Sequence, residues 1–179
     1  MSKQVLVIST SPRKGGNSDT LADEFVRGAQ EAGNNVEKIA LYDHTIGFCK
    51  GCLACQKTQR CVIRDDSDTI AQKMLTADIL VFATPIYYYG ICGQMKTMLD
   101  RANPLFSADY QFRNIYLLAA AAEENEHTAD GAVTALQGWI DCFEKSCLSG
   151  IVFAGGVTSV GDIRNHPALK KAYEMGRTV

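Results

Sequence analysis

The sequence predicts an α/β fold: a doubly wound three-layer sandwich in which helices cover both faces of a parallel sheet. Two observations lead to this prediction. Five short apolar runs recur along the 179 residues, and stretches of helical periodicity separate them. Runs without polar alternation are typical of strands that are buried on both faces. Because this length suits one compact domain and no repeat or linker interrupts the pattern, residues 1–179 are expected to form a single domain.

Each predicted element follows from its own pattern. The five predicted strands are residues 5–8, 36–41, 79–83, 115–120 and 151–154. The first helix carries Leu21, Phe25 and Ala29 at helical spacing and ends before Gly33, which tolerates a left-handed backbone. The second begins at the capping residues 66–68. Three more helices are expected. One covers residues 95–102 and another begins at Pro167. The third, between them, has an apolar face formed by Ala132, Leu136, Trp139, Ile140 and Phe143.

Composition and charge exclude several classes of protein. Hydrophobic residues make up 46% of the chain and charged residues 21%, as in globular domains rather than disordered chains or coiled coils. The longest apolar run, residues 115–122, is too short to cross a bilayer. Eighteen basic residues against twenty acidic ones leave no excess for binding a nucleic-acid backbone. The first four residues lack the basic region of a signal peptide, so a cytoplasmic protein without a membrane partner is expected.

The loop after the first strand has the composition of a phosphate-binding loop. It joins a strand to a helix N-terminus, where unpaired N–H groups and the helix dipole favour an anion. Its candidate ligands are hydroxyl groups and one cation, namely Ser9, Ser11, Arg13, Ser18 and Thr20. Neither G-x-x-x-x-G-K-[ST] nor G-x-G-x-x-G occurs, which disfavours a nucleoside triphosphatase or a dinucleotide-binding Rossmann site. The alternative is a plain polar loop in which Ser18 or Asp19 caps the helix.

The cysteines are the most unusual feature of the composition. Four of seven lie within thirteen residues, at Cys49, Cys52, Cys55 and Cys61. The three-residue spacing suits a loop around one [4Fe–4S] cluster, although the last gap is longer than in the bacterial ferredoxin pattern. Zinc, a redox-active dithiol or merely packed thiols are the open alternatives. The other three, Cys92, Cys142 and Cys147, are expected to be buried and inert.

Several motifs, in order over residues 5–101, resemble those of the NAD(P)H-dependent FMN reductase and iron–sulfur flavoprotein family. They are Ser11-Pro12-Arg13 with Asn17-Ser18, the cysteine motif with Asp65-Asp66, Thr84-Pro85-Ile86-Tyr87, and Gly93-x-x-Lys96-x-x-x-Asp100-Arg101. The resemblance implies a flavodoxin-like fold with strand order 2-1-3-4-5. Two positions depart from the family pattern. Thr10 stands where Gly is usual, and Glu123-Glu124 follow the fourth strand instead of small polar residues.

The resemblance also implies a cofactor and its ligands. FMN is expected to bind through its phosphate to the loop after the first strand, with Asn17 joining the ligands named above. Its ring is expected against Pro85, Ile86, Tyr87 and Tyr88, which supply a flat, stiff wall. A [4Fe–4S] cluster on the four cysteines would lie close to the flavin at the same sheet edge. A homodimer or homotetramer with the tyrosine loop at the contact is expected.

Two functions are open at this point. The first is an FMN-dependent NAD(P)H oxidoreductase that reduces a small-molecule acceptor or a redox protein. Hydride transfer needs no acidic or basic side chain, so no catalytic residue is expected. The second is an electron-transfer protein with flavin and an iron–sulfur cluster but no small-molecule substrate of its own. The cysteine segment favours the second function, whereas a net charge of −2 does not supply the acidic docking surface of a flavodoxin-like carrier.

Overall fold

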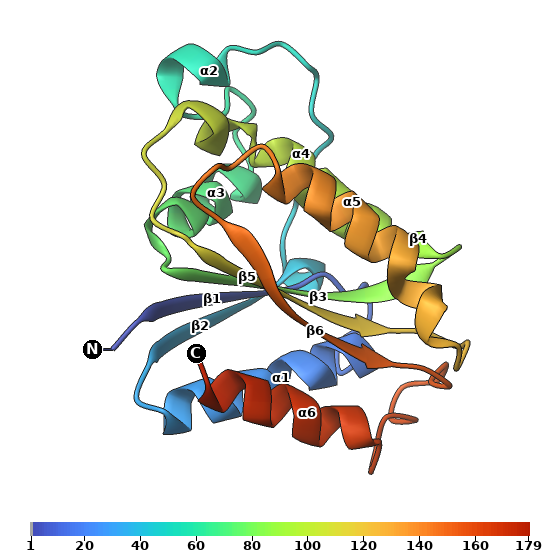
Figure 1. Ribbon diagram of the computed structural model, residues 1–179. Coiled ribbons are helices and arrows are strands. Elements are labelled where there is room, and N and C mark those ends of the chain that lie inside the picture. Colours follow the sequence, from blue (N-terminus) through green and yellow to red (C-terminus); the bar gives the residue numbers. More distant parts are fainter. Residues whose placement is uncertain (1) are drawn as a thin grey trace.

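The computed structural model describes residues 2–179. Its parallel sheet has the order β2-β1-β3-β5-β6 (Figure 1). The strands are β1 (Gln4–Ser9), β2 (Asn35–Ala40), β3 (Ile79–Tyr87), β5 (Asn114–Ala120) and β6 (Cys147–Ala154). Numbered among themselves, these five parallel strands have the predicted order 2-1-3-4-5, so the predicted fold class is confirmed. A further short strand, β4 (Gly90–Ile91), pairs antiparallel with the end of β3 and was not predicted.

Helices cover both faces of this sheet. Figure 1 shows α1 (Asn17–Glu31) and α6 (Pro167–Arg177) on one face, and α3 (Asp66–Thr76), α4 (Gly93–Arg101) and α5 (Asp130–Ile140) on the other. A short helix, α2 (Cys55–Thr58), lies within the cysteine segment. Three 3-10 turns complete the chain: η1 (Leu41–Asp43), η2 (Asn103–Ser107) and η3 (Glu126–Ala129). Across residues 2–179, no helix is both long and apolar enough to span a bilayer.

Most element boundaries lie within two residues of the sequence prediction, and three differences affect how the core or the site is built. β3 continues to Tyr87, because Thr84 and Pro85 still pair with β5 where a loop was expected. β6 begins at Cys147, four residues earlier than predicted, since a half-exposed edge strand shows no continuous apolar run. α5 ends at Ile140, so Phe143 packs into the core from the turn beyond the helix rather than from the helix itself.

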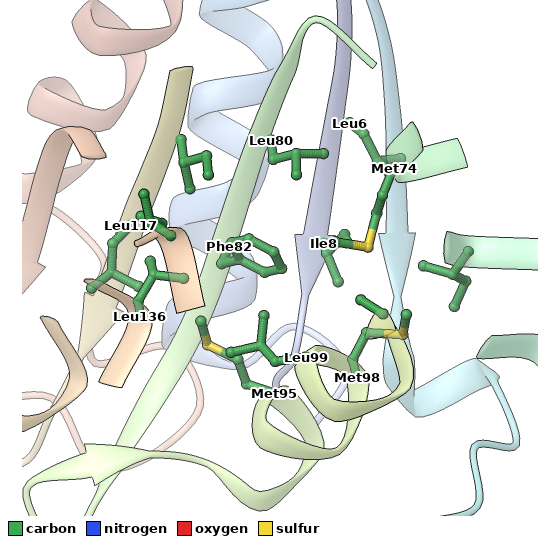
Figure 2. Packing of buried hydrophobic residues seen from close by; sticks show 14 of the residues in the cluster. Leu6, Ile8, Met74, Leu80, Phe82, Met95, Met98, Leu99, Leu117 and Leu136 are labelled. Carbon is green, nitrogen blue, oxygen red and sulfur yellow. The ribbon is translucent and has the colours of Figure 1, made fainter. Parts of the chain in front are cut away.

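Alternate side chains of the central strands fill two cores. Leu6 and Ile8 of β1 face α3 and α4, whereas Val5 and Val7 face α1 and α6. In Figure 2, Met95, Met98 and Leu99 of α4 extend toward Ile8 and Phe82 of the sheet. Because β1 and β3 are buried on both sides, the sheet fixes where their carboxyl ends emerge.

Two glycines let α1 and α6 pack with their backbones in contact. A Cβ on Gly28 would overlap the carbonyl oxygen of Tyr173, and one on Gly176 would overlap that of Phe25. Neither backbone can yield without separating the helices. The glycines therefore hold α1, and with it the loop at its N-terminus, close to the sheet.

Replacing Gly28 with Ala is expected to lower the free energy of unfolding by about 1–3 kcal/mol, because the added methyl group overpacks this contact. Urea unfolding measures the loss. Gly138→Ala is the matched control. Gly138 also lies in a helix, but no neighbouring atom comes within 4 Å of the place that an added methyl group would occupy. That variant is expected to gain roughly 0.5–1 kcal/mol from helix propensity. Equal stability of the two variants would contradict the packing argument.

Candidate functional site

The loop between β1 and α1 is folded by contacts within itself. The Ser11 hydroxyl donates to the Arg13 carbonyl at 2.8 Å and accepts from the Arg13 N–H at 3.1 Å. Gly15 adopts a positive φ of 64°, which a residue with a side chain rarely does. Gly16 then precedes the first turn of α1, and no side chain caps this helix. The predicted alternative, in which Ser18 or Asp19 caps α1, is therefore wrong.

The uncapped helix end has the properties of an anion site. The first N–H groups of α1 lack intrahelical partners and carry the positive end of the helix dipole. A Cβ on Gly16 would come within 2.6 Å of Ser11 Oγ, so glycine keeps this approach open. Arg13 adds an exposed cation at the rim. The donor set and the open cradle fit a phosphate group.

An ion pair beneath the loop supports it. Asp19 accepts the Gly15 N–H at 3.0 Å and pairs with Lys38 at 2.7 Å. Lys38 also pairs with Asp23 at 2.6 Å. Burial acts to lower the pKa of Lys38, but hydrogen bonds to both carboxylates outweigh it and raise that pKa. Lys38 therefore stays charged and offsets a carboxylate that would otherwise repel an anion on α1.

Most predicted ligands meet in one cavity of about 140 Å³ above this helix end. The residues that line it are Ser11, Arg13, Gly16, Asn17, Ser18, Pro85, Ile86, Tyr87, Ala120, Ala121, Ala122, Val157 and Thr158. Seven of the ten predicted cofactor ligands are among them. Three are not. Ser9 is buried with its hydroxyl unpartnered, Thr20 donates to the Gly16 carbonyl within the helix, and Tyr88 is fully exposed.

The turn after β6 forms a wall that the sequence patterns did not reveal. Arg13 donates to the Thr158 carbonyl at 3.2 Å. The side-chain amide of Asn17 donates to the Ser159 carbonyl at 3.0 Å, and its oxygen accepts the Ile163 N–H at 3.3 Å. The Asn17 side chain therefore joins this turn to α1, which leaves its backbone N–H for an anion. Only the position of this turn, directly after the carboxyl end of an edge strand, could have indicated from the sequence that it contributes to the site.

Thr10 does not obstruct the site. Its hydroxyl donates to the Ala83 carbonyl at 2.9 Å and lies 3.2 Å from the sulfur of Cys92. The residue is fully buried and is not among those that line the cavity. Its side chain thus links the loop after β1 to the middle of β3 and does not narrow the approach of a phosphate.

The tyrosine loop is a tight hairpin with an unusual backbone. Tyr87 pairs with Gly90, so only Tyr88 and Tyr89 connect the two strands. Both have positive φ values, 50° and 62°. This geometry is usual for Asn-Gly in such hairpins and costs free energy in aromatic residues. Gly131 of α5 lies against the Tyr89 carbonyl, which holds the hairpin beside the cavity.

The four clustered cysteines line a second, larger cavity of about 390 Å³. Its other walls are mainly apolar and include Leu99, Trp139 and Phe143. Within residues 2–179, no three His, Cys, Asp or Glu side chains converge as ligands of one metal ion. A cubane cluster does not require that convergence, because each thiolate binds a separate iron atom. Four sulfurs around one apolar cavity fit such a cluster.

The isolated cysteines differ from the prediction. Cys92 is fully buried, as expected, but Cys142 and Cys147 are exposed. Cys142 follows α5 and lines the same cavity as the four clustered cysteines. Cys147 begins the edge strand β6, where its thiol lies 3.4 Å from the Ser149 hydroxyl. Apolar sequence neighbours were misleading here, because the helix ends earlier and the edge strand is half open.

Arg101 joins α4 to both ends of the cysteine segment, residues 49–61. Its guanidinium is fully buried and donates to Asp65 through two bonds of 2.7 and 2.9 Å. It also donates to the carbonyls of Gly47 at 2.7 Å and Ile63 at 3.3 Å. Burial acts to raise the pKa of Asp65, but hydrogen bonds from Arg101, Gly47 and Ser67 outweigh it and hold that pKa well below its ordinary range.

The two cavities lie at opposite ends of α4 and α5. The hairpin beside the first cavity packs on the start of α5 at Gly131, whereas the second is lined by Trp139 and Phe143 near its end. At 1.5 Å per residue, the eleven residues of α5 span about 16 Å. Within this chain the cavity of the cysteines and the cavity at α1 are therefore separate, and the expected closeness of cluster and flavin stays a prediction. The segment leaves β2 and folds back over the helices (Figure 1).

Comparisons with known proteins show which proteins this chain resembles. The sequence pattern of the family described as NADPH-dependent FMN reductase matches residues 4–159. An iron–sulfur flavoprotein of Methanosarcina thermophila is 29% identical over 168 residues, which cover 94% of this chain and 85% of that protein. Another, from Methanocaldococcus jannaschii, is 38% identical over 111 residues, 62% of this chain. The match spans only 57% of that relative's own length.

A solved structure shares the whole fold. The NAD(P)H:quinone oxidoreductase from Methanothermobacter marburgensis superposes with a TM-score of 0.77. The superposition covers 99% of this chain and 96% of that one, at 17% sequence identity. Likeness at this identity concerns the fold alone, and it confirms the flavodoxin-like architecture expected from the motifs.

Asp65→Asn is expected to destabilise the protein at neutral pH by about 3–5 kcal/mol, because it leaves Arg101 buried with a weakened partner. The folded-state pKa of Asp65 is lowered, so its stabilisation is complete above the unfolded value of about 4 and is lost as pH falls further. The gap between wild type and variant in urea unfolding should thus be equal at pH 7 and pH 5 and shrink below pH 4.

Asp100→Asn is the control for this experiment. Asp100 also pairs with a cation of α4, Lys96, but both side chains are exposed. Its loss is expected to be under about 1 kcal/mol. A gap for Asp65→Asn that stays constant down to pH 3 would show that the stabilisation by Asp65 does not depend on the negative charge of its carboxylate.

Proposed function

The chain belongs to the NADPH-dependent FMN reductase family, and from this premise we propose that it is an FMN-dependent oxidoreductase that uses NADH or NADPH as electron donor. The observation that carries the proposal is the uncapped N-terminus of α1, open to a cavity lined by Ser11, Arg13 and Ser18. These groups are suited to the FMN phosphate. When bound, FMN supplies the redox chemistry, with a hydride arriving from NAD(P)H and two electrons leaving to an acceptor.

The chain's own contribution is to bind and orient the cofactor. The cavity of about 140 Å³ takes the phosphate end, and the flavin ring would lie along Pro85, Ile86 and Tyr87 at the end of β3. The positive helix end and Arg13 offset the phosphate charge. No side chain has to move a proton for the hydride step, which agrees with a site built of small, apolar and hydroxyl groups.

A quinone is the acceptor class that we propose. One solved structure that shares the fold is named a quinone oxidoreductase, and the exposed tyrosine hairpin offers a flat aromatic surface beside the proposed flavin wall. The reaction balances as NAD(P)H, a proton and a quinone giving NAD(P)⁺ and a hydroquinone. Nitro compounds, free flavin and a redox protein are the other acceptors to be compared.

The cysteine segment supports a second role. We propose that Cys49, Cys52, Cys55 and Cys61 hold a [4Fe–4S] cluster in the apolar cavity that they line. Leu53, between two of them, has a positive φ of 55°, and strain of this kind gathers at functional sites. Relatives named iron–sulfur flavoproteins support this assignment. With a cluster, single-electron transfer to a protein partner becomes the alternative to quinone reduction.

We also propose a homodimer or homotetramer with the tyrosine hairpin at the contact. Tyr88 is fully exposed and Tyr89 is 62% exposed, on a hairpin whose positive φ values hold both rings outward. The cavity is smaller than an FMN molecule, so a second copy of the chain would cover the part that extends beyond it.

Anaerobically purified protein tests the function directly. Its absorption spectrum should show flavin, and steady-state oxidation of NADH or NADPH should require a quinone. If no small-molecule acceptor supports NAD(P)H oxidation, but reduced ferredoxin reduces the protein, the protein is instead an electron carrier. The same sample in sedimentation velocity at micromolar concentration should exceed the monomer mass, and a monomer would contradict the proposed assembly.

Arg13→Ala with Ser18→Ala is expected to weaken FMN binding. Each hydrogen bond to a charged group contributes about 1.5–3 kcal/mol, so the dissociation constant should rise by at least tenfold. Riboflavin, which lacks the phosphate, should bind the variant and the wild type alike. Arg27→Ala is the matched control, since Arg27 lies on the exposed face of α1 and pairs with Glu24. Unchanged FMN affinity in the double variant would refute the phosphate site.

A further inference from the structure

Two side chains from the α4–η2 region donate hydrogen bonds to sulfurs of the cysteine segment. Arg101 Nη2 lies 3.3 Å from Cys61 Sγ. Asn103 Nδ2 lies 3.0 Å from Cys55 Sγ. Both donors lie outside the cysteine motif, and no sequence pattern gives either of them a role toward the cysteines. Their geometry links α4 to the sulfurs as well as to the ends of the segment.

The contact of Arg101 with sulfur is not needed to close the segment. Its bonds to Asp65, Gly47 and Ile63 already hold both ends. Within residues 2–179, Arg101 Nε is the one guanidinium nitrogen that is buried without a partner. Nη2 donates to Asp65 Oδ1 at 2.9 Å and lies 3.3 Å from both the Ile63 carbonyl oxygen and Cys61 Sγ, so a cysteine sulfur is one of its three acceptors.

Asn103 gives an independent observation. It begins η2, at the start of Asn103–Ser107, and its amide donates to Cys55 rather than to either end of the segment. A neutral amide beside a neutral thiol forms only a weak bond. Beside a thiolate or a metal-bound sulfur, the same N–H group is a much stronger donor. Both sulfur contacts thus suit cysteines that ligate a metal.

We infer that Arg101 and Asn103 are positioning residues that hold Cys61 and Cys55 as cluster ligands and raise the reduction potential of the cluster. The inference rests on the proposed function, since it takes the four cysteines as iron ligands. Hydrogen bonds to cluster sulfurs withdraw negative charge. They therefore favour the reduced, more negative form, and hydrogen bonding is among the factors that set cluster potentials.

The test compares midpoint potentials after anaerobic reconstitution of the full chain with iron and sulfide. Asn103→Leu removes an N–H donor at similar size, and Arg101→Lys keeps the charge but loses the planar fork. Both variants should retain iron and show a more negative cluster potential in an EPR-monitored redox titration. Gln94→Leu is the control, because Gln94 is an exposed amide of α4 that does not line the cavity of the cysteines. It should leave the potential unchanged.

Each outcome decides the inference. Potentials equal to that of the wild type in both sulfur-donor variants would overturn it, and so would a wild-type chain that retains no iron. If Arg101→Lys fails to fold, Asn103→Leu decides alone, since Asn103 makes no bond to the ends of the segment. The flavin absorbance of each sample is recorded separately. A wild-type chain that retains flavin but no iron overturns this inference and leaves the flavin oxidoreductase standing.

Discussion

Burial of β1 and β3 on both faces is the constraint from which the rest of the site follows. Their backbone groups have no water to bond, so they pair with β2, with each other and with β5. Parallel pairing brings the carboxyl ends of the strands to one edge of the sheet. The chain must leave that edge through tight turns, and α1 can return along the sheet only if it starts there. The uncapped helix end is therefore a consequence of the topology, and the small residues 15 and 16 let an anion reach it.

The cysteine segment, residues 49–61, is held in place by side-chain contacts rather than by the sheet. No strand passes through it, and its only helix has one turn, α2. Order comes instead from Arg101, which bonds to groups on either side of the motif, and from η2, which contacts α2 through Ser107 and Gln56. A buried guanidinium is costly unless it is fully paired. Asp65 supplies the opposite charge and two of the hydrogen bonds, so this ion pair helps to fix a segment that has no buried residue of its own.

Sequence patterns predicted the layers and most of the flavin cavity because both follow from short-range regularities. Apolar runs mark buried strands, and a Ser- and Gly-rich stretch before a helix marks an anion site. The missed features depend on distant contacts. Nothing near Thr158 in the sequence indicates that Arg13 and Asn17 bond to its turn. Likewise, Tyr88 has a positive φ because β3 continues through Pro85 and pairs with β4 in a tight hairpin. The conformational preferences of tyrosine do not predict this backbone.

The placement of the cysteines shows most clearly where sequence order fails as a guide to space. The segment follows β2, whose carboxyl end lies beside that of β1, and adjacency in the sheet suggested adjacency of the two sites. After His44, however, the chain turns away from the sheet edge and runs over α4 toward η2. The apolar wall formed by Trp139 and Phe143 lies there. Arg101, at the C-terminal end of α4, holds the cysteine segment in this place through its bonds to Asp65. The contacts of the segment with that wall and with Arg101 thus decide where it lies, and the two cavities are separated by about the length of a helix.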